Sequence, residues 1–345
     1  MLEIKGLKVS FRTYSGEVQA VRGVDLELEE GGILAIVGES GCGKSVTAQS
    51  ILKLHDPGIA SYKDGEILLD GKDLLKFSEK EIQKIRGKEI SMIFQDPMTS
   101  LNPTMTVGNQ IIEVLREHER DGKGRKISKK AARERAVELL KMVRIPNAER
   151  RINEYPHEFS GGQRQRVMIA IAMACAPRIL IADEPTTALD VTVQAQILEL
   201  MKEMQRERGT SIIIISHDMG AVASIAKNVA VMYGGLVVES GTAEDIFYRH
   251  EHPYTKGLLD SVPKAGQRKD KELDSIEGTP PDLVKPPVGC PFADRCKYAM
   301  QICRDHLPEE TVLSDDHKCR CWLLDSECPH KRLSLRKYDD SDGEE

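Results

Sequence analysis

Residues 38–45 constrain this chain more than any other segment. They read G-E-S-G-C-G-K-S and fit the pattern G-x-x-x-x-G-K-[ST], in which a glycine-rich loop surrounds phosphate groups with its backbone amides. An apolar run precedes them at residues 33–37, and a helical pattern follows at residues 45–54. The motif needs this order of strand, loop and helix, because the helix N-terminus adds a positive dipole end. The sequence therefore predicts that the chain binds a nucleoside triphosphate.

Two side chains of this phosphate loop have separate expected roles. Lys44 can reach the terminal phosphates, and the Ser45 hydroxyl can bind Mg²⁺. Cys42 lies at a helix N-terminus, where its thiol could have a lowered pKa and react with alkylating agents. It could also be only a small residue that fills the loop, which is the interpretation we favour. The other residues expected to line the nucleotide are Gly38, Ser40, Gly41, Gly43 and Val46.

A pair of carboxylates follows an apolar run at residues 180–182. Asp183 can reach the Mg²⁺ through water, and Glu184 can orient or deprotonate an attacking water. Attack of water on a γ-phosphate requires this division of roles. The alternative is an acidic pair on the surface at a strand end, but the phosphate loop upstream favours the catalytic interpretation.

The chain alternates strand and helix patterns, which predicts an α/β fold with a parallel core sheet. No apolar run reaches the roughly 18 residues that a membrane-spanning helix needs, and the first residues lack the apolar core of a signal peptide. The net charge of −6 argues against general nucleic-acid binding. We expect a cytoplasmic protein. The main predicted strands are 2–11, 21–28, 65–69, 90–94, 179–182, 211–215 and 229–232, and the main predicted helices are 163–176, 191–208 and 219–226, with Asp190 and Gly209 at the ends of the second.

A second candidate anion site lies at Ser160, Gly161, Gly162 and Gln163, just before a predicted helix. These residues could also form an ordinary helix cap. With the preceding Phe159 they resemble the signature motif of the ATP-binding subunits of ATP-binding-cassette (ABC) transporters, in which Leu is commonest at the first position. In that family the motif faces the phosphate loop of a second cassette, so that two ATP molecules lie between two cassettes.

The resemblance implies a P-loop NTPase fold of the ABC type. Such a cassette has a parallel core sheet, an antiparallel β subdomain and an α-helical subdomain. We expect the cassette at residues 1–250, with its helical subdomain near residues 97–176. A linker at 251–289, a Cys-rich C-terminal appendage at 290–330 and an acidic tail at 331–345 would follow.

Other motifs of the family occur in the expected order, and their roles here are those that the resemblance implies. Tyr14 would stack on adenine, although it could be only a residue at a strand end. Gln95 would sense Mg²⁺, together with Ser45 and Asp183, and would link to the membrane partner. Asp190 would contact the opposite cassette. His217 would contact the γ-phosphate, although a lone His after a strand is more often structural.

Three segments are typical of the oligopeptide/dipeptide importer group: 182–192, 252–259 and 289–296. This similarity implies an ATP hydrolase that energises peptide import from the cytoplasmic face of the membrane. Its partners would be a second ABC ATPase subunit, either a homologue or a copy, two transmembrane permease subunits and, indirectly, an extracellular substrate-binding protein, with no nucleic acid. The alternatives are a soluble ABC ATPase of translation or DNA repair, a weakly hydrolysing regulatory subunit, and a transporter of nickel or another solute.

The C-terminal region concentrates the cysteines. Four thiolates could hold a [4Fe–4S] cluster or a structural zinc, or the thiols could be free. The absence of C-x₂-C pairs argues against zinc, and some members of the importer group are thought to carry a [4Fe–4S] cluster here. The group's pattern favours Cys321 over Cys319 as fourth ligand, because Trp322 and Leu323 follow it. The expected ligands are Cys290, Cys296, Cys303 and Cys321.

Overall fold

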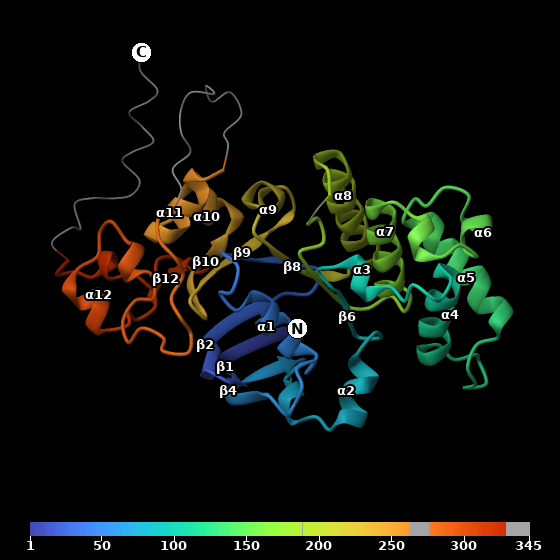
Figure 1. The fold of residues 1–345 in the computed structure, drawn as a ribbon, viewed down its shortest axis with the longest axis horizontal. Coiled ribbons are helices and arrows are strands. Elements are labelled where there is room, and N and C mark those ends of the chain that lie inside the picture. Colours follow the sequence, from blue (N-terminus) through green and yellow to red (C-terminus); the bar gives the residue numbers. More distant parts are fainter. Residues whose placement is uncertain (188, 263–275, 329–345) are drawn as a thin grey trace, which may run out of the picture. The chain divides into compact units, whose positions relative to one another are not determined.

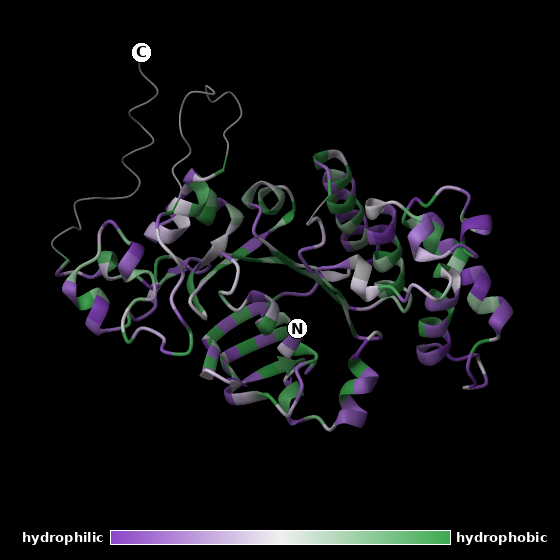
Figure 2. Cartoon of the chain, viewed as in Figure 1, coloured by the Kyte–Doolittle hydropathy of each residue, from purple (hydrophilic) through white to green (hydrophobic). Residues whose placement is uncertain are grey.

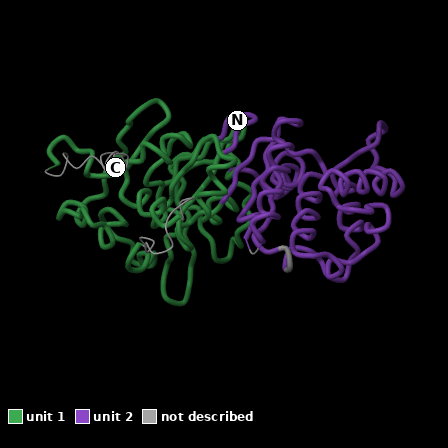
Figure 3. The backbone as a smooth tube through the Cα atoms, turned by 90° about the horizontal axis from the view of Figure 1, so that it is seen from above, with its two compact units in different colours: residues 1–27, 34–75, 216–345 green, residues 28–33, 76–215 purple. Residues whose placement is uncertain are grey.

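The computed structural model describes residues 1–187, 189–262 and 276–328. The chain forms two compact units (Figure 3). Unit 1 comprises residues 1–27, 34–75 and the described residues from Ser216 onward, and unit 2 comprises residues 28–33 and 76–215. The predicted helical subdomain at 97–176 falls within unit 2, whereas residues 1–250 contribute to both units. The predicted tail at 331–345 lies outside the described residues.

The first sheet of unit 1 is antiparallel, with strand order β2-β1-β4-β5 (Figure 1). Hydrophobic and hydrophilic residues alternate along β1, β2 and β4 (Figure 2), as expected for a sheet with one face on the core. In β1 the buried positions shift from Leu2 and Ile4 to Leu7 and Val9 across a bulge. Gly6, with φ +57°, accommodates this bulge. The strands are β1 (Leu2–Thr13), β2 (Gly16–Leu28), β4 (Ala60–Leu69) and β5 (Lys72–Asp73).

The second sheet of unit 1 carries the phosphate loop. The strands of this sheet that fall in unit 1 follow the order β11-β12-β10-β9-β3, with β3 and β9 parallel and the other neighbours among them antiparallel. All five residues of β3 (Ile33–Val37) are buried, which is the pattern of a strand covered on both faces. The other strands are β9 (Asn228–Tyr233), β10 (Leu236–Thr242), β11 (Thr311–Val312) and β12 (Lys318–Cys319), and the helices of unit 1 are α1 (Lys44–Ile51), α9 (Met219–Ile225), α10 (Ala243–Tyr248), α11 (Pro253–Asp260) and α12 (Gln301–Asp305).

Unit 2 contains three parallel strands in the order β8-β7-β6, which together with the β3–β9 pair confirm the predicted parallel core sheet. Helices α4, α5, α6 and α7 pack against one another (Figure 1). The strands are β6 (Ile90–Ile93), β7 (Ile179–Asp183) and β8 (Ser211–Ser216), and the helices are α2 (Glu79–Ile85), α3 (Pro97–Ser100), α4 (Val107–His118), α5 (Lys129–Met142), α6 (Ala148–Arg151), α7 (Gly161–Ala172) and α8 (Val191–Arg208).

Helix α8 begins and ends where the sequence predicted. The Asp190 carboxylate accepts a hydrogen bond from the Val193 amide at 3.0 Å, so it satisfies a backbone donor that the first turn leaves open. Gly209 ends the helix with φ +67°, a conformation that glycine adopts without strain. Among the described residues, no helix combines the length and the apolar character required to cross a membrane.

The segment predicted as a linker, 251–289, contains helix α11. His252 caps it by accepting a hydrogen bond from the Tyr254 amide at 3.0 Å, and Pro253 occupies its first turn, where proline is tolerated. Tyr254 is fully buried. Farther along, β12 pairs with β10, with Glu239 opposite Cys319. Residues of the Cys-rich segment therefore belong to the same sheet as the strand that leads into the phosphate loop.

Candidate nucleotide-binding site

The phosphate loop lies between β3 and α1 in unit 1, as predicted. Two of its glycines cannot be replaced without a shift of the backbone. Gly38 has φ +146°, and an added Cβ would overlap the carbonyl oxygen of Met232. Gly43 has φ +102°, and an added Cβ would overlap the carbonyl oxygen of Ala20. Glycine is needed here because the loop both turns through a left-handed conformation and runs close to neighbouring backbone.

Lys44 is buried and folds back over the start of the loop. Its ammonium donates hydrogen bonds to the carbonyl oxygens of Gly38 and Glu39, both at 2.8 Å. These bonds hold a positive charge beside the loop backbone. This is the position from which a lysine can contact the terminal phosphates of a nucleotide.

Cys42 is a small buried residue of the loop, with 4% of its surface exposed. Burial raises the pKa of the Cys42 thiol, and the nearby Lys44 ammonium opposes this shift only in part. The alternative of a lowered pKa at this helix N-terminus is therefore wrong, because the cost of desolvating a thiolate exceeds the attraction of the lysine.

We expect slow alkylation of Cys42 by iodoacetamide in the native protein at pH 8, because the thiol is both inaccessible and protonated. Its rate should keep rising with pH beyond the usual thiol pKa of 9.0. Peptide mass spectrometry after timed labelling measures this rate, and the same protein unfolded in guanidinium chloride is the control. Equal rates in the native and unfolded protein would contradict the burial argument.

The predicted carboxylates lie at the end of β7 in unit 2. Asp183 is its last residue and is buried. Glu184 has φ +47°, which is rare for a residue other than glycine. Its carboxylate oxygen Oε2 accepts hydrogen bonds from Gln95 Nε2 and Thr187 Oγ1, both at 2.9 Å. A strained backbone with a carboxylate fixed by two donors is typical of a functional residue.

Gln95 and Glu184 are thus brought together, although 89 positions separate them in the sequence. The sequence predicted neither this hydrogen bond nor the one that Thr187 donates to Glu184. The remaining polar atom of the Gln95 side chain is an amide oxygen. This oxygen and the Asp183 carboxylate of the same unit are hard oxygen donors, the kind that Mg²⁺ prefers. The Ser45 hydroxyl of unit 1 is a donor of the same kind.

The signature residues begin helix α7 in unit 2. Ser160 and Gln163 form a capping box, in which the Ser160 hydroxyl accepts from the Gln163 amide and the Gln163 side chain accepts from the Ser160 amide. An added Cβ at Gly162 would lie 2.5 Å from Cγ1 of Val193, so glycine allows α7 to begin close to α8. Ser160 and Gly161 remain exposed. The start of α7 is therefore open to solvent at these two residues.

The other predicted residues are exposed positions between elements. The Tyr14 ring is fully exposed at the turn between β1 and β2. His217 lies between β8 and α9, and the following Asp218 caps α9. By position in the sequence, unit 1 carries the phosphate loop, Tyr14 and His217, whereas unit 2 carries Gln95, Asp183, Glu184, Asp190 and the signature residues.

The cysteines predicted as cluster ligands all lie within the described residues. The Cys290 amide donates to the Cys303 carbonyl at 2.7 Å. Burial raises the pKa of Cys290 to about 12 and that of Cys296 to about 11. It also raises the pKa of Cys321, with further contributions from the other three thiols. Four mutually interacting thiols are a suitable donor set for iron or zinc, but the described part of the chain contains no assembled group of metal ligands.

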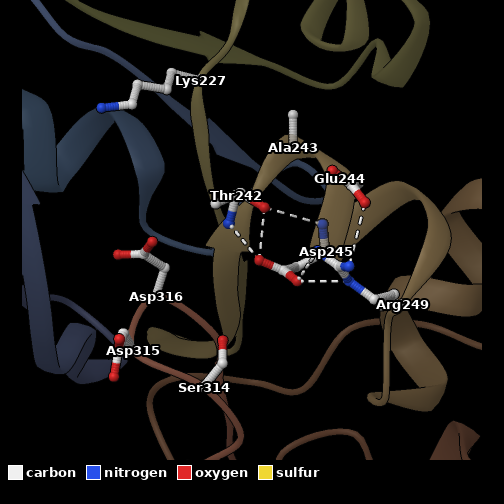
Figure 4. Close-up of a pocket in the computed structure, with 9 residues that line it drawn as sticks. All are labelled: Lys227, Thr242, Ala243, Glu244, Asp245, Arg249, Ser314, Asp315 and Asp316. Carbon is white, nitrogen blue, oxygen red and sulfur yellow. Dashed lines mark hydrogen bonds and ion pairs between the residues drawn. The ribbon is translucent and has the colours of Figure 1, made fainter.

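A surface pocket of about 520 Å³ lies elsewhere in unit 1 (Figure 4). Its polar groups bond largely to one another: the Thr242 hydroxyl donates to Asp245 at 2.6 Å, and Arg249 pairs with Asp245 at 2.8 Å. None of the residues predicted as functional lines it. The lining residues are Lys227, Thr242, Ala243, Glu244, Asp245, Arg249, Ser314, Asp315 and Asp316.

Comparison with known proteins identifies the family. The model of the ABC transporter family matches residues 21–187, and that of the oligopeptide/dipeptide transporter C-terminal region matches residues 238–303. The oligopeptide transport ATP-binding protein OppD of Bacillus subtilis is 59% identical over 329 residues, which are 95% of this chain and 90% of that protein. The chain belongs to the ABC family of transport ATP-binding proteins.

Other members support this assignment of the cassette. The dipeptide transport ATP-binding protein DppD of Bacillus subtilis is 56% identical over 334 residues, 97% of this chain and 98% of that protein. A bacterial ABC transporter cassette solved as a dimer superposes with a TM-score of 0.63, at 30% identity, over 70% of this chain and 99% of that one. The same cassette in a post-hydrolysis state with ADP and phosphate also gives 0.63, at 29% identity.

Each of the two family models covers a different part of the predicted site residues. The first includes the phosphate loop, Gln95, the signature residues, Asp183 and Glu184. The second includes three of the four predicted cluster cysteines and ends before Cys321. His217 falls between the two matched regions, so its role depends on the resemblance in motif order alone.

Proposed function

We propose that this chain hydrolyses ATP to energise the import of dipeptides or oligopeptides across the cytoplasmic membrane. The observation that carries the hydrolytic part is the Glu184 carboxylate, fixed by Gln95 and Thr187 after a strand of the parallel sheet. The peptide part follows from the C-terminal region matched at residues 238–303 and from the names of the relatives. Those names favour a transport subunit over an ATPase of translation or repair and over a transporter of nickel.

The proposed mechanism assigns one role to each residue. The amides of the phosphate loop and the Lys44 ammonium bind the phosphates, and Tyr14 stacks on the adenine. Ser45, Gln95 and Asp183 would hold Mg²⁺, which would supply positive charge to offset that of the phosphates. Glu184 accepts a proton from the attacking water, and His217 contacts the γ-phosphate.

The proposed assembly completes each site with a second chain. Ser160, Gly161, Gly162 and Gln163 would face the nucleotide of a partner cassette, because the exposed start of α7 presents backbone donors outward. Asp190 would contact the partner as well as cap α8. Two permease subunits would move with the ATP cycle of the paired cassettes. A substrate-binding protein outside the cell would select the peptide. The chain itself would lie at the cytoplasmic face of the membrane.

Uptake measurements in cells test this function. Deletion of the gene should abolish uptake of labelled dipeptides or oligopeptides, and should leave nickel uptake unchanged. The wild-type gene should restore peptide uptake, whereas a Glu184→Gln gene expressed at the same level should not. Loss of nickel uptake with unchanged peptide uptake would contradict the proposed substrate, and restoration by Glu184→Gln would contradict the proposed mechanism.

We further propose a [4Fe–4S] cluster on Cys290, Cys296, Cys303 and Cys321. Burial raises the pKa values of the Cys290, Cys296 and Cys321 thiols, and a bound cation would offset that cost by stabilising the thiolates. Cys319 differs because it lies in β12, opposite Glu239, where a carboxylate also disfavours its thiolate. A cluster would give order to a segment with few large apolar residues.

Anaerobic purification should therefore yield a coloured protein with about four iron atoms per chain. Cys321→Ser should lose the iron and the visible absorption, because the cluster would lack a ligand. Cys319→Ser, two positions away, is the matched control and should keep both. A colourless protein with zinc or with no metal, or iron lost only from Cys319→Ser, would overturn this assignment.

A further inference from the structure

Glu39, the second residue of the phosphate loop, is held through all of its polar groups. Its carbonyl oxygen accepts from Lys44 Nζ at 2.8 Å. Its amide donates to the hydroxyl of Tyr254 at 2.8 Å, and its carboxylate accepts from both terminal nitrogens of Arg295, at 2.6 and 3.0 Å. These two partners lie 215 and 256 positions later in the chain. Glu39 therefore connects the phosphate-binding lysine to the C-terminal region within unit 1.

The Arg295 side chain is only 6% exposed, and other groups fix its orientation. Besides its two bonds to Glu39, Nε donates to the Glu277 carbonyl at 2.8 Å, Nη2 to the Ile276 carbonyl at 2.9 Å, and Nη1 to the Tyr233 hydroxyl at 3.0 Å. All five donors of the guanidinium are thus used. A bidentate pair with a fully satisfied guanidinium has a well-defined geometry, so Arg295 holds the carboxylate in one place.

Aromatic rings lie beside this contact, with the Arg295 guanidinium carbon 5.7 Å from the ring centre of Tyr233 and 6.0 Å from that of Phe292. The rings of Tyr233 and Tyr254 lie 4.5 Å apart, and Phe292 lies 5.3 Å from each of them. Tyr233 ends β9, Tyr254 lies in the first turn of α11, and Phe292 precedes the short 3₁₀ turn that contains Arg295. This cluster joins three separate segments of unit 1. Packing of this kind limits the movement of Tyr254 and Arg295 relative to the loop.

The charge of Glu39 explains why a nucleotide would respond to this contact. A carboxylate in a loop that binds a triphosphate adds repulsion, because both groups are negative. The Glu39 side chain is 24% exposed, so solvent screens its charge only in part. Arg295 supplies the compensating positive charge at hydrogen-bonding distance.

We propose that Arg295 and Tyr254 are positioning residues for nucleotide binding. They act through Glu39, whose backbone and charge they fix, and the C-terminal region thereby sets the affinity of the phosphate loop for ATP. This inference rests on the proposed binding of ATP phosphates by residues 38–45.

The test is a titration of the purified full chain with ATP by isothermal calorimetry. Arg295→Gln should raise the Kd for ATP roughly tenfold or more, because it leaves a partly buried carboxylate uncompensated. Addition of Glu39→Gln to the same chain should restore the Kd to near the parental value, since the repulsive charge is then gone. Tyr254→Phe, which removes one hydroxyl and keeps the ring packing, should weaken ATP binding by a smaller factor without unfolding.

Arg304→Gln is the matched control. Arg304 lies in the same segment beside a cysteine, as Arg295 does, but it pairs with Asp294 at the exposed surface. Its loss should leave the Kd unchanged. If the Arg295→Gln, Glu39→Gln double variant binds ATP as weakly as Arg295→Gln, the inference is wrong, because the effect would then be structural. The inference is also wrong if Arg295→Gln and Tyr254→Phe both bind ATP with the parental affinity.

A Lys44→Ala chain separates this inference from the proposed function. If Lys44→Ala weakens ATP binding and Arg295→Gln does not, the positioning role is wrong and the proposed phosphate loop stands. If Lys44→Ala also binds ATP normally, the proposed function of the loop is wrong as well.

Discussion

Replacement of Glu184 by Gln should leave ATP binding intact and slow ATP turnover by roughly 10²- to 10⁴-fold. The amide has nearly the shape of the carboxylate and keeps an oxygen that can accept the hydrogen bonds of Gln95 and Thr187. It cannot accept a proton from the attacking water. The two effects therefore separate, and the variant should accumulate in the ATP-bound state.

Phosphate release by the assembled transporter at saturating ATP measures turnover, and filter binding of labelled ATP measures affinity. Glu199→Gln is the matched control, because Glu199 lies on α8 in the same unit and pairs with the surface cations Lys202 and Arg206. It should hydrolyse ATP at the parental rate. If Glu184→Gln hydrolyses ATP at the parental rate, Glu184 is not the catalytic base. If both variants lose the same fraction of ATP turnover, the cause is general damage to the protein.

Lys44→Ala should weaken ATP binding by about 100-fold or more and abolish hydrolysis with it. The substitution removes a buried ammonium from the loop, together with its hydrogen bonds to the carbonyl oxygens of Gly38 and Glu39. The loop then loses both a phosphate ligand and two bonds that shape it. Calorimetric titration with ATP gives the affinity directly.

Lys53→Ala provides the comparison for this experiment. Lys53 also donates to a backbone carbonyl, that of Leu75, at 2.9 Å, in the same unit. The Lys53→Ala variant loses an ammonium and its hydrogen bond to a backbone carbonyl at a position outside the phosphate loop. Its affinity for ATP should equal that of the parental chain. If the two variants bind ATP equally well, the proposed role of Lys44 is wrong.

Much of the fold could be predicted, because the local sequence patterns of helices and strands match the residues that the structure buries. Helix α8 was predicted with both of its ends, since Asp190 and Gly209 have strong preferences for those positions. Strands β7 and β8 were predicted because continuous apolar runs suit strands covered on both faces. The two-residue strands β11 and β12 could not be predicted, because so short a segment has no periodicity and forms only by pairing, β12 with β10 and β11 with β12.

The residues of the candidate site likewise fall into those that the sequence predicts and those that only the folded chain reveals. The motif identified Lys44, because the spacing of the loop glycines is a local requirement. The contact between Gln95 and Glu184, the left-handed backbone of Glu184 and the bond from Arg295 to Glu39 depend on the folded chain. Arg295 and Tyr254 lie inside segments that the sequence marked as typical of the importer group, yet only the structure suggests what they do there.

The most direct test of the account is ATP-driven peptide uptake into proteoliposomes that contain the complete transporter with its substrate-binding protein. With the wild-type chain, uptake should require hydrolysable ATP and should stop when a non-hydrolysable analogue replaces it. With the Glu184→Gln chain assembled to the same level, uptake should fall with ATP turnover. Peptide uptake at the wild-type rate with Glu184→Gln, or with the analogue, would contradict the claim that ATP hydrolysis by this chain drives import.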